Sequence, residues 1–533
     1  MVSLDNSKVF HVKIKHTFSL NKEKYISRLS ESCKTLLKVC GGRLMPYEKT
    51  REGKLKALKR KPEEILDLIK KENIKFIDLH FTDVPGKLQH TTISADFLEV
   101  ESFAEGIPKL DGSSIRGYVE IHESDMVLKP DPSTFAVIPW MPENLKTARM
   151  FCDVYWGFGL GRFPRDPRGV AQKAEQVLKE AGYDVSYWGP EVEFFVFDKV
   201  SWDILSAYKG QSYSIESKEA IWNVEGTSYP IRFKEGYFSA SPQDTFMEFR
   251  CECARVLTEY FGVVCDVHHH EVAGAGQGEI NFYRDSLTNA GDSVMTLKYV
   301  VRNLAYQHGK LATFMPKPIF MDNASGMHVH VSLWKDGKNA FYDPDDPHAE
   351  ISQLARYFGG GLLEHARSLA AIVAPTTNSY RRLVPGYEAP VYIAWSRRNR
   401  SACLRVPVYH KGPKASKQKR LEFRPPDPSC NPYLCFAAML AAGLDGIKKK
   451  IDIGDPVDED IYKLTPERRK QLGIKELPGS LKEAVECLQS DQEYLKPIFS
   501  QDLIDKIIEL ETNEHKEVNL RPHPYEFYLY FDR

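Results

Sequence analysis

The stretch Gly189-Pro-Glu-Val-Glu-Phe-Phe-Val-Phe197 decides the fold, because its residues are typical of a β-strand. It begins with Gly-Pro and continues with aromatic and β-branched residues. Side chains two apart on a strand share a face, so Glu191 and Glu193 point the same way. Phe195 and Phe197 continue that face. Two carboxylates on one face of an apolar strand repel each other and are costly to desolvate. The pattern favours a face that meets cations; the alternative is an edge strand with two solvated glutamates.

Three further segments carry acids or imidazoles at the same spacing of two. They are residues 263–283 with Glu271 and Glu279, Gly326–Trp334 with His328, His330 and Ser332, and Arg420–Arg424 with Glu422 and Arg424. Carboxylate-rich ligand sets with one histidine suit Mg²⁺ or Mn²⁺ rather than a thiolate-type zinc site. Four such segments in one chain therefore predict a site for divalent cations on neighbouring strands.

The segment 263–283 also predicts a β-hairpin. Its centre is the glycine-rich turn Gly274–Gly278, with strand-like residues on both sides. Glu271 and Glu279 are symmetrical about Ala275 in the sequence. We therefore expect these two acids to be cross-strand neighbours.

The composition is that of an ordinary globular protein. The chain has 533 residues, enough for about three domains, or two with insertions. Hydrophobic residues make up 42% and charged residues 27%, and the net charge of -1 gives no global attraction to nucleic acid or membrane. The apolar run 433–444 is too short to span a bilayer, which needs ~20 residues. The ten cysteines contain no CxxC pair, so reduced thiols in a cytoplasmic protein are the simplest account.

Changes in composition divide the chain into three predicted parts. Residues 1–60 are expected to be an N-terminal extension with a basic linker, and Met45 is an alternative start. Residues 61–150 are expected to form a small α+β domain, and residues 151–533 a larger domain that ends in helices. Within these parts, we predict helices over Pro62–Glu72, Gly169–Ala181, Ser293–Ala312, Ile351–Ala374 and from Asn431 onward, strands over Phe76–Asp83 and Leu88–Ile93, and an irregular insertion over Trp202–Tyr237.

Any nucleotide must be held by metals and basic side chains. No P-loop is present, and the glycine-rich stretches Gly157–Gly161 and Gly274–Gly278 do not run into a helix as a dinucleotide fingerprint requires. The segment Ser396–Arg405 is rich in arginine, whose planar guanidinium binds carboxylates and phosphates in bidentate fashion. A solvated basic loop is the alternative. Metal carboxylates together with an arginine cluster favour phosphoryl transfer.

Taken together, these motifs closely resemble type I glutamine synthetase from about residue 62 to the C-terminus. The matching motifs are Asp111–Ser114, Gly189–Glu193, His269–Glu279, Pro316–Pro318, Asn323–His328, Asn378–Pro390, Asn399–Ala402 and Glu422–Pro428. The resemblance implies an α+β fold, with a small N-terminal β-grasp domain and a larger catalytic domain whose antiparallel sheet forms part of a barrel. It also implies a homododecamer of two hexameric rings, in which the small domain of one chain closes the site of the next.

The resemblance also implies residue roles. One metal ion would be held by Glu193, Glu271 and Glu279, and a second by Glu191, His328 and Glu422. Glutamate, its carboxylates or the transferred phosphoryl would contact Arg382, Arg400, Arg424, Asn323 and Ala324, the last where the family usually has glycine. ATP would contact Ser332, Arg405 and Lys417, of which Lys417 is placed only by counting back from Glu422. Asp111, with Ser114 in the same motif, would bind ammonium and take its proton, and Glu388 would close a flap over the site.

The implied reaction is ATP-dependent ligation of ammonia to the γ-carboxylate of L-glutamate through γ-glutamyl phosphate, with two or more Mg²⁺ or Mn²⁺ ions. A γ-glutamyl–amine ligase acting on a polyamine is the alternative within the enzyme class, and the intact Asp111–Ser114 motif favours ammonia. A catalytically inactive structural homologue is the third possibility. No nucleic acid or membrane partner is expected. Regulation in the family varies and includes small partner proteins, and Tyr462, near the adenylylated position of some members, has different flanking residues.

Overall fold

The computed structural model describes residues 60–533, apart from 207, 224, 225, 227, 398 and 409. Of the earlier residues it describes only the backbone of four short strands, β1 (Val39–Cys40), β2 (Arg43–Leu44), β3 (Tyr47–Lys49) and β4 (Leu55–Ala57). The predicted N-terminal extension, its basic linker and the alternative start at Met45 otherwise lie outside the described residues.

The first sheet confirms the small α+β unit. Its strands are β5 (Phe76–Thr82), β6 (Leu88–Ser94), β7 (Ile107–Asp111), β8 (Asp125–Pro130), β9 (Ala136–Val137) and β10 (Thr147–Trp156), in the order β6-β5-β10-β8-β7 with β9 beside β10. Helix α2 (Pro62–Lys71) begins with proline at its first position and buries Ile65, Leu68 and Ile69. The predicted helix and the hairpin of β5 and β6 are thus present, and the sheet continues to Trp156.

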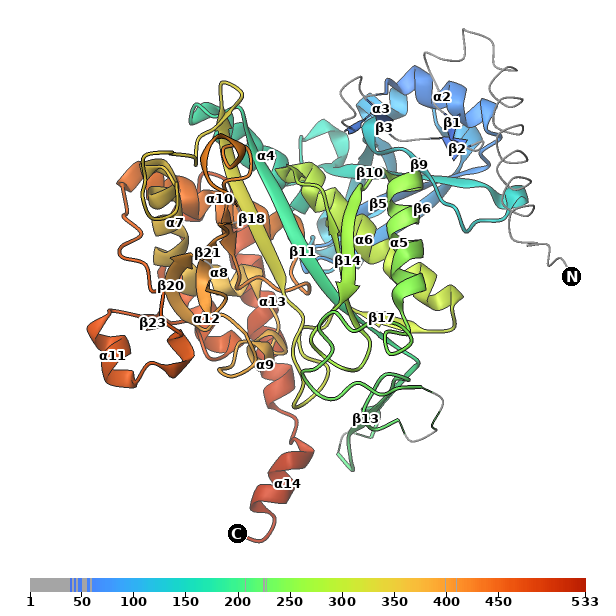
Figure 1. Cartoon of the computed structure of the whole chain (residues 1–533). Coiled ribbons are helices and arrows are strands. Elements are labelled where there is room, and N and C mark those ends of the chain that lie inside the picture. The colour runs from blue at the N-terminus through green and yellow to red at the C-terminus, as the bar shows by residue number, and fades with distance from the viewer. Residues whose placement is uncertain are drawn as a thin grey trace, which may run out of the picture.

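The second sheet carries the four acidic segments on neighbouring strands. Its order is β14-β15-β11-β18-β22-β21-β20-β23. The strands are β11 (Val185–Phe197), β14 (Cys265–His270), β15 (Gln277–Phe282), β16 (Asp285–Ser286), β17 (Leu311–Thr313), β18 (Met327–Lys335), β19 (Lys338–Asn339), β20 (Tyr392–Arg397), β21 (Ala402–Val406), β22 (Leu421–Phe423) and β23 (Lys475–Glu476). Pairing along this path is antiparallel except between β20 and β21, which are parallel. Figure 1 shows β11 and β18 side by side as the two long strands at the centre.

Strand β11 has two chemically different faces, as its alternation predicts. Val192 and Phe194 belong to the main hydrophobic core, whereas Phe195 and Phe197 pack in a separate small cluster with Ala273 and Ala275. Glu191 and Glu193 share the face of that second cluster. The alternative of a solvated edge strand is wrong, because β11 has β15 on one side and β18 on the other.

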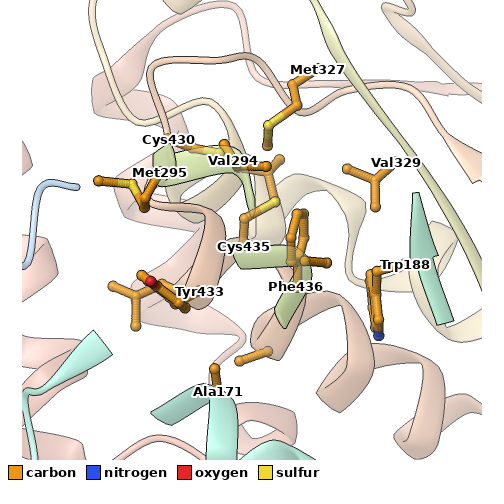
Figure 2. Close-up of a cluster of buried hydrophobic side chains, with 14 of the residues drawn as sticks. Ala171, Trp188, Val294, Met295, Met327, Val329, Cys430, Tyr433, Cys435 and Phe436 are labelled. Carbon is orange, nitrogen blue, oxygen red and sulfur yellow. The ribbon is translucent and has the colours of Figure 1, made fainter. Parts of the chain in front are cut away.

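Helices pack on the core face of the second sheet and on one another. The main ones are α4 (Pro167–Glu180), α5 (Met247–Phe261), α6 (Leu287–Gln307), α7 (Gln353–Glu364), α8 (Ala366–Val373), α10 (Pro432–Lys449), α12 (Leu481–Ser490) and α13 (Gln501–Asn519). Of the short helices, α3 (Glu101–Glu105) precedes α4, α9 (Ser379–Arg382) and α11 (Pro466–Gln471) lie between the longer helices, and α14 (Pro524–Tyr530) follows α13. Helix α10 is buried along most of its length, and Phe436 stacks on Trp188 of β11 with ring centroids 5.3 Å apart (Figure 2). This packing fixes the sheet behind the acidic face.

Two helix predictions needed correction. Helix α6 runs over Leu287–Gln307 and not Ser293–Ala312. Gly291, a poor helix former, hides the true start, and it is required because a Cβ there would lie 2.4 Å from the ring of Tyr433. The predicted helix 351–374 is two helices, α7 and α8, which are separated at His365. The His365 ring contacts Asp445 and Asp491.

The predicted insertion contains regular structure. Strands β12 (Lys199–Asp203) and β13 (Ser212–Glu216) form a separate two-stranded sheet within it. Among the described residues, no helix is both long and apolar enough to cross a lipid bilayer.

Candidate active site

The site is a row of acids and histidines across four adjacent strands. Strand register places Glu193 opposite Glu279 of β15, and Glu191 opposite His328 of β18. His330 of β18 in turn lies opposite Glu422 of β22. The sequence therefore brings the predicted metal ligands together by β-sheet pairing, with each acid held on a strand that is buried on its other face.

The predicted pairing of Glu271 with Glu279 is wrong. Glu279 lies opposite His269 of β14, and Glu271 follows the strand and donates its backbone N–H to the carbonyl of Gln277. The loop between the strands runs from Glu271 to Gly276, so the centre of symmetry is displaced from Ala275. Ligand atoms of His269, Glu271 and Glu279 nevertheless lie within 4.8 Å of one another. The two acids are diagonal neighbours, and His269 is a site residue that the sequence reading missed.

Three of the acids repel one another strongly. Burial raises the pKa of Glu193 to about 8, and the charge of Glu279 adds to the shift. Burial also raises the pKa of Glu271 and of Glu279 above their ordinary values, and Glu193 contributes for Glu271. Three buried carboxyl groups whose pKa values are all raised form a site that gains greatly from a bound cation.

Glu422 and Glu191 have the opposite electrostatics. Burial opposes ionisation of Glu422, but the positive charge of Arg424 outweighs it and lowers the pKa of that carboxyl. Arg424 Nη1 donates to Glu422 Oε1 at 2.5 Å, and Arg405 of β21 donates to Oε2. The pKa of Glu191 is likewise lowered, to about 2, because His330 outweighs the effect of burial. These two acids stay ionised without a metal.

Hydrogen bonding gives His328 a free ring nitrogen. A carbonyl oxygen only accepts, so His328 Nδ1 carries the proton that it donates to the Arg424 carbonyl at 3.2 Å. Nε2 is left with its lone pair, 3.7 Å from Glu193 Oε1. Burial and the charge of Arg424 hold the pKa of His328 well below its usual value, so the ring is neutral. A neutral histidine whose other N–H is held by a carbonyl is the usual form of a metal ligand.

His330 has the opposite tautomer. Arg420 Nε is always a donor, and it lies 3.1 Å from His330 Nδ1, which must therefore accept. The ring proton is then on Nε2, which donates to Glu191 Oε1 at 2.8 Å. His330, Glu191 and Glu422 have ligand atoms within 4.8 Å of one another. In this arrangement, however, His330 offers an N–H to Glu191 and no lone pair to a cation.

A backbone wall closes the site beside Glu193. Gly326 N donates to Glu193 Oε2 at 3.0 Å, and Gln277 Nε2 reaches the same oxygen at 3.1 Å and the Ala324 carbonyl at 3.2 Å. Arg382 is buried behind this wall and donates to the backbone carbonyls of Pro425 and Arg424. A Cβ at Gly326 would lie 2.9 Å from Arg382 Nη2, so the close approach requires glycine. Asn323 is buried next to Ala324 in this segment.

The remaining predicted residues lie around this centre or apart from it. Ser332 follows His330 on β18 and accepts a hydrogen bond from Trp334 Nε1 at 3.0 Å. Arg400 interacts with the hydroxyl of Tyr237, whose ring packs edge-on against His269. The backbone carbonyl of Lys417 accepts from Arg284 Nη1 at 2.8 Å. Glu388 is exposed and has a left-handed backbone, with φ of 59°.

Asp111 and Ser114 are in the first sheet, at the exposed end of β7. Asp111 Oδ1 accepts from Ser113 N at 3.0 Å and from Ser113 Oγ at 2.7 Å. Oδ2 accepts from Ser114 Oγ at 2.8 Å. The hydrogen bonds from Ser113 and Ser114 lower the pKa of Asp111, so the carboxylate is an exposed fixed charge. In the described part of the chain, no hydrogen bond joins Asp111 to the acids of the second sheet.

Comparison with known proteins identifies this arrangement. The chain matches the model of the glutamine synthetase beta-Grasp domain over residues 73–157 and that of the glutamine synthetase catalytic domain over residues 164–530. It is 56% identical to a glutamine synthetase from Sulfolobus acidocaldarius over 476 residues, which cover 89% of this chain and 99% of the relative. A glutamine synthetase from Aquifex aeolicus is 48% identical over 476 residues, covering 88% and 99%.

The fold is also shared with solved structures. A cryoEM structure of Plasmodium falciparum glutamine synthetase aligns with a TM-score of 0.79 and 26% identity, covering 88% of this chain and 99% of that one. The predicted α+β class, with a β-grasp domain followed by a larger curled sheet, is thereby confirmed. The chain belongs to the glutamine synthetase family.

Proposed function

We propose that this chain is a ligase that uses ATP to join ammonia to the γ-carboxylate of L-glutamate, giving L-glutamine, ADP and phosphate. The observation that carries this proposal is the row of acids and one lone-pair histidine on β11, β15, β18 and β22, flanked by buried arginines. The names of the relatives support the same reaction. We also propose domain limits of 61–150 for the β-grasp domain and 151–533 for the catalytic domain, after an extension over 1–60.

The donor set fits hard divalent cations. Carboxylate oxygens with one imidazole suit Mg²⁺ or Mn²⁺, and burial raises the pKa values of Glu193, Glu271 and Glu279, which favours a bound cation in place of their protons. In our proposal Glu193, Glu271 and Glu279 hold one ion, and Glu191, His328 and Glu422 hold a second. When bound, such ions neutralise the charge of ATP and of the transferred phosphoryl group.

The arginines position the substrates. Arg382, Arg400 and Arg424 are proposed to bind glutamate carboxylates or the transferred phosphoryl, together with Asn323 and the Ala324 backbone. Arg405 is proposed to bind ATP phosphates, with Ser332 and Lys417 as further ATP contacts. A γ-carboxylate oxygen of glutamate attacks the γ-phosphorus of ATP and ADP leaves, so that γ-glutamyl phosphate forms. The guanidinium groups of Arg382, Arg405 and Arg424 are already buried, so they need little reorganisation to stabilise this charge, whereas Arg400 is exposed.

The second step needs a base for ammonium. Asp111 is proposed to attract ammonium by its fixed charge and to take its proton, with Ser114 orienting the carboxylate. The nitrogen of ammonia then attacks the γ-carbonyl carbon and phosphate leaves. Glu388 is proposed to cover the acyl phosphate. Because Asp111 is exposed on the first sheet, we propose that it serves the site of a neighbouring chain in a homododecamer. A cytoplasmic location and a small regulatory protein remain part of this proposal.

An assay of nitrogen donors tests the proposed substrate. The purified chain is given glutamate, ATP, Mg²⁺ and either ammonium or putrescine at equal concentration. We expect glutamine from ammonium and little γ-glutamylputrescine. Ligation of putrescine without glutamine would establish the amine ligase instead, and an absence of both products with intact folding would favour an inactive homologue.

The tautomers of the two β18 histidines predict different effects of mutation. His328→Ala removes a ring nitrogen with a free lone pair, so we expect Mn²⁺ affinity to fall by more than ~100-fold. His330→Gln keeps an N–H donor for Glu191, and we expect a loss below ~10-fold. Mn²⁺ titration followed by electron paramagnetic resonance measures both. The reverse order of effects would show that His330 is the metal ligand.

Metal binding should release protons and depend on pH. In the metal-free folded chain the pKa of Glu193 is about 8, against an ordinary value of 4.5. The folded chain thus binds more protons than the unfolded chain between these values, and its stability falls as the pH rises through about 8. A cation replaces the protons, so we expect the rise in Tm on adding Mn²⁺ to grow with pH over this range. Calorimetry in buffers of different ionisation enthalpy should detect proton release, and a pH-independent rise in Tm without proton release would contradict the assignment.

A further inference from the structure

The loop that carries Glu388 is held by contacts at Tyr387 and at its C-terminal end. Residues 384–389, here called the 384–389 loop, lie between α9 and β20. The backbone is left-handed at Gly386, with φ of 91°, and at Glu388, with φ of 59°. Tyr387 lies between these two residues and is the aromatic side chain of the loop.

Two lysines from different segments clasp Tyr387. The ammonium groups of Lys234 and Lys317 each lie 4.0 Å from the centroid of its ring. Lys234 Nζ also donates to the Gly386 carbonyl at 3.2 Å. The electron-rich face of a tyrosine ring attracts ammonium groups at this distance, so the contact holds the loop although the ammonium groups repel each other. We call Tyr387, Lys234 and Lys317 the clasp.

Both lysines of the clasp donate hydrogen bonds to Asp322, which precedes Asn323 and Ala324 of the active site. Lys317 Nζ donates to the Asp322 carbonyl, and the backbone N–H of Lys234 donates to Asp322 Oδ1 at 2.9 Å. Oδ1 also accepts from the N–H of Asn323 at 3.0 Å. Oδ2 accepts from Gly274 at 2.8 Å, in the loop that follows Glu271. The position of the 384–389 loop is therefore linked to segments on both sides of Glu193.

The far end of the loop has a second anchor. Tyr462 donates its hydroxyl to the Ala389 carbonyl at 2.6 Å. Between this anchor and the clasp lies only Glu388. The position of Glu388 thus depends on both contacts, and the clasp is the one that joins the loop to two further segments, those of Lys234 and Lys317.

We propose that the clasp is a closing device, in which Tyr387 is a positioning residue that holds the 384–389 loop over the site while γ-glutamyl phosphate is present. The proposal rests on the proposed function. When the clasp opens, the loop lifts and water reaches the acyl phosphate, which is then hydrolysed to glutamate and phosphate. Loss of the clasp should therefore uncouple ATP consumption from glutamine formation without weakening metal binding.

The test compares variants at position 387. Tyr387→Leu keeps an apolar side chain and removes the ring. We expect uncoupled phosphate release, measured as the phosphate formed beyond one per glutamine, to rise roughly 5- to 30-fold. KM for glutamate should rise, and metal affinity should not change. Tyr387→Phe keeps the ring face and should behave like the unmodified chain. Tyr229→Leu is the matched control, because Tyr229 is 67% exposed in the same insertion as Lys234.

A second measurement separates the clasp from the proposed function. Hydrogen exchange of the peptide containing Glu388 and Ala389 should be faster in Tyr387→Leu and in Lys234→Gln, unchanged in Tyr387→Phe, and not additive in the double variant. This result stands even if the unmodified chain forms no glutamine, which would overturn the proposed function alone. Normal coupling and normal exchange in Tyr387→Leu would overturn the clasp, as would a Tyr387→Phe variant as impaired as Tyr387→Leu.

Discussion

Glu193→Gln should give a folded protein whose rate of glutamine formation is lower by ~10²- to 10³-fold or more. Burial and the neighbouring charge of Glu279 keep the Glu193 carboxyl protonated near neutral pH when no cation is bound. Glutamine has nearly the shape of that protonated acid, and its oxygen can still accept from Gly326 N. We therefore expect the metal-free variant to be at least as stable as the unmodified chain. It should lose the negative charge that a divalent ion requires.

The measurement combines steady-state assays with thermal unfolding, with and without Mn²⁺. The unmodified chain should be stabilised by Mn²⁺, and Glu193→Gln should gain much less. Glu235→Gln is the control, because the Glu235 side chain is exposed and pairs with Arg232. A Glu193→Gln variant that unfolds, or one that retains activity and its response to Mn²⁺, would contradict the role given to Glu193.

Asp111→Asn should lower the rate of glutamine synthesis by ~10²- to 10⁴-fold, while slow release of phosphate from ATP continues. Asparagine is also a good turn residue, so the turn closed by Ser113 and Ser114 should persist. The change removes the fixed charge that attracts ammonium and the group that takes its proton. Phosphorylation of glutamate depends on other residues and should be affected less. The ratio of phosphate to glutamine, measured over a range of ammonium concentrations, reports the difference.

The control for Asp111 is its cross-strand neighbour. Asp125 lies opposite Asp111 on β8 and is also exposed, so Asp125→Asn removes a similar charge from the same sheet edge. We expect Asp125→Asn to form glutamine normally. Near-normal synthesis by Asp111→Asn at low ammonium would show that Asp111 only shapes its turn.

The parts of the site that depend on local strand geometry were predictable from the sequence. Alternation alone places Glu191 and Glu193 on one face of β11, and puts Arg424, just after β22, on the same side as Glu422, where their side chains meet. Likewise, His328 and His330 share a face of β18, opposite the buried residues Val329 and Val331. A spacing of two residues predicts which side chains share a face, because the pleat of a β-strand places alternate side chains on opposite faces.

Features that depend on register and strand order were not predictable in the same way. The displaced loop after Glu271 brings His269 opposite Glu279, and no local pattern reports that shift. Similarly, Arg405 reaches Glu422 only because β21 is the neighbour of β22. The tautomers of His328 and His330 depend on Arg424 and Arg420, nearly a hundred residues away in the chain. The run of three histidines before Glu271 was the one available signal for His269.

The most direct test of the central claim follows oxygen from glutamate into phosphate. The purified chain is given L-glutamate labelled with ¹⁸O in the γ-carboxylate, ¹⁵N-ammonium, ATP and Mg²⁺. Attack of the carboxylate on ATP, followed by displacement of phosphate by ammonia, must move one carboxylate oxygen into each phosphate. We predict one ¹⁸O-labelled phosphate for each ¹⁵N-glutamine formed. Glutamine with unlabelled phosphate, or phosphate release without any glutamine, would contradict the account.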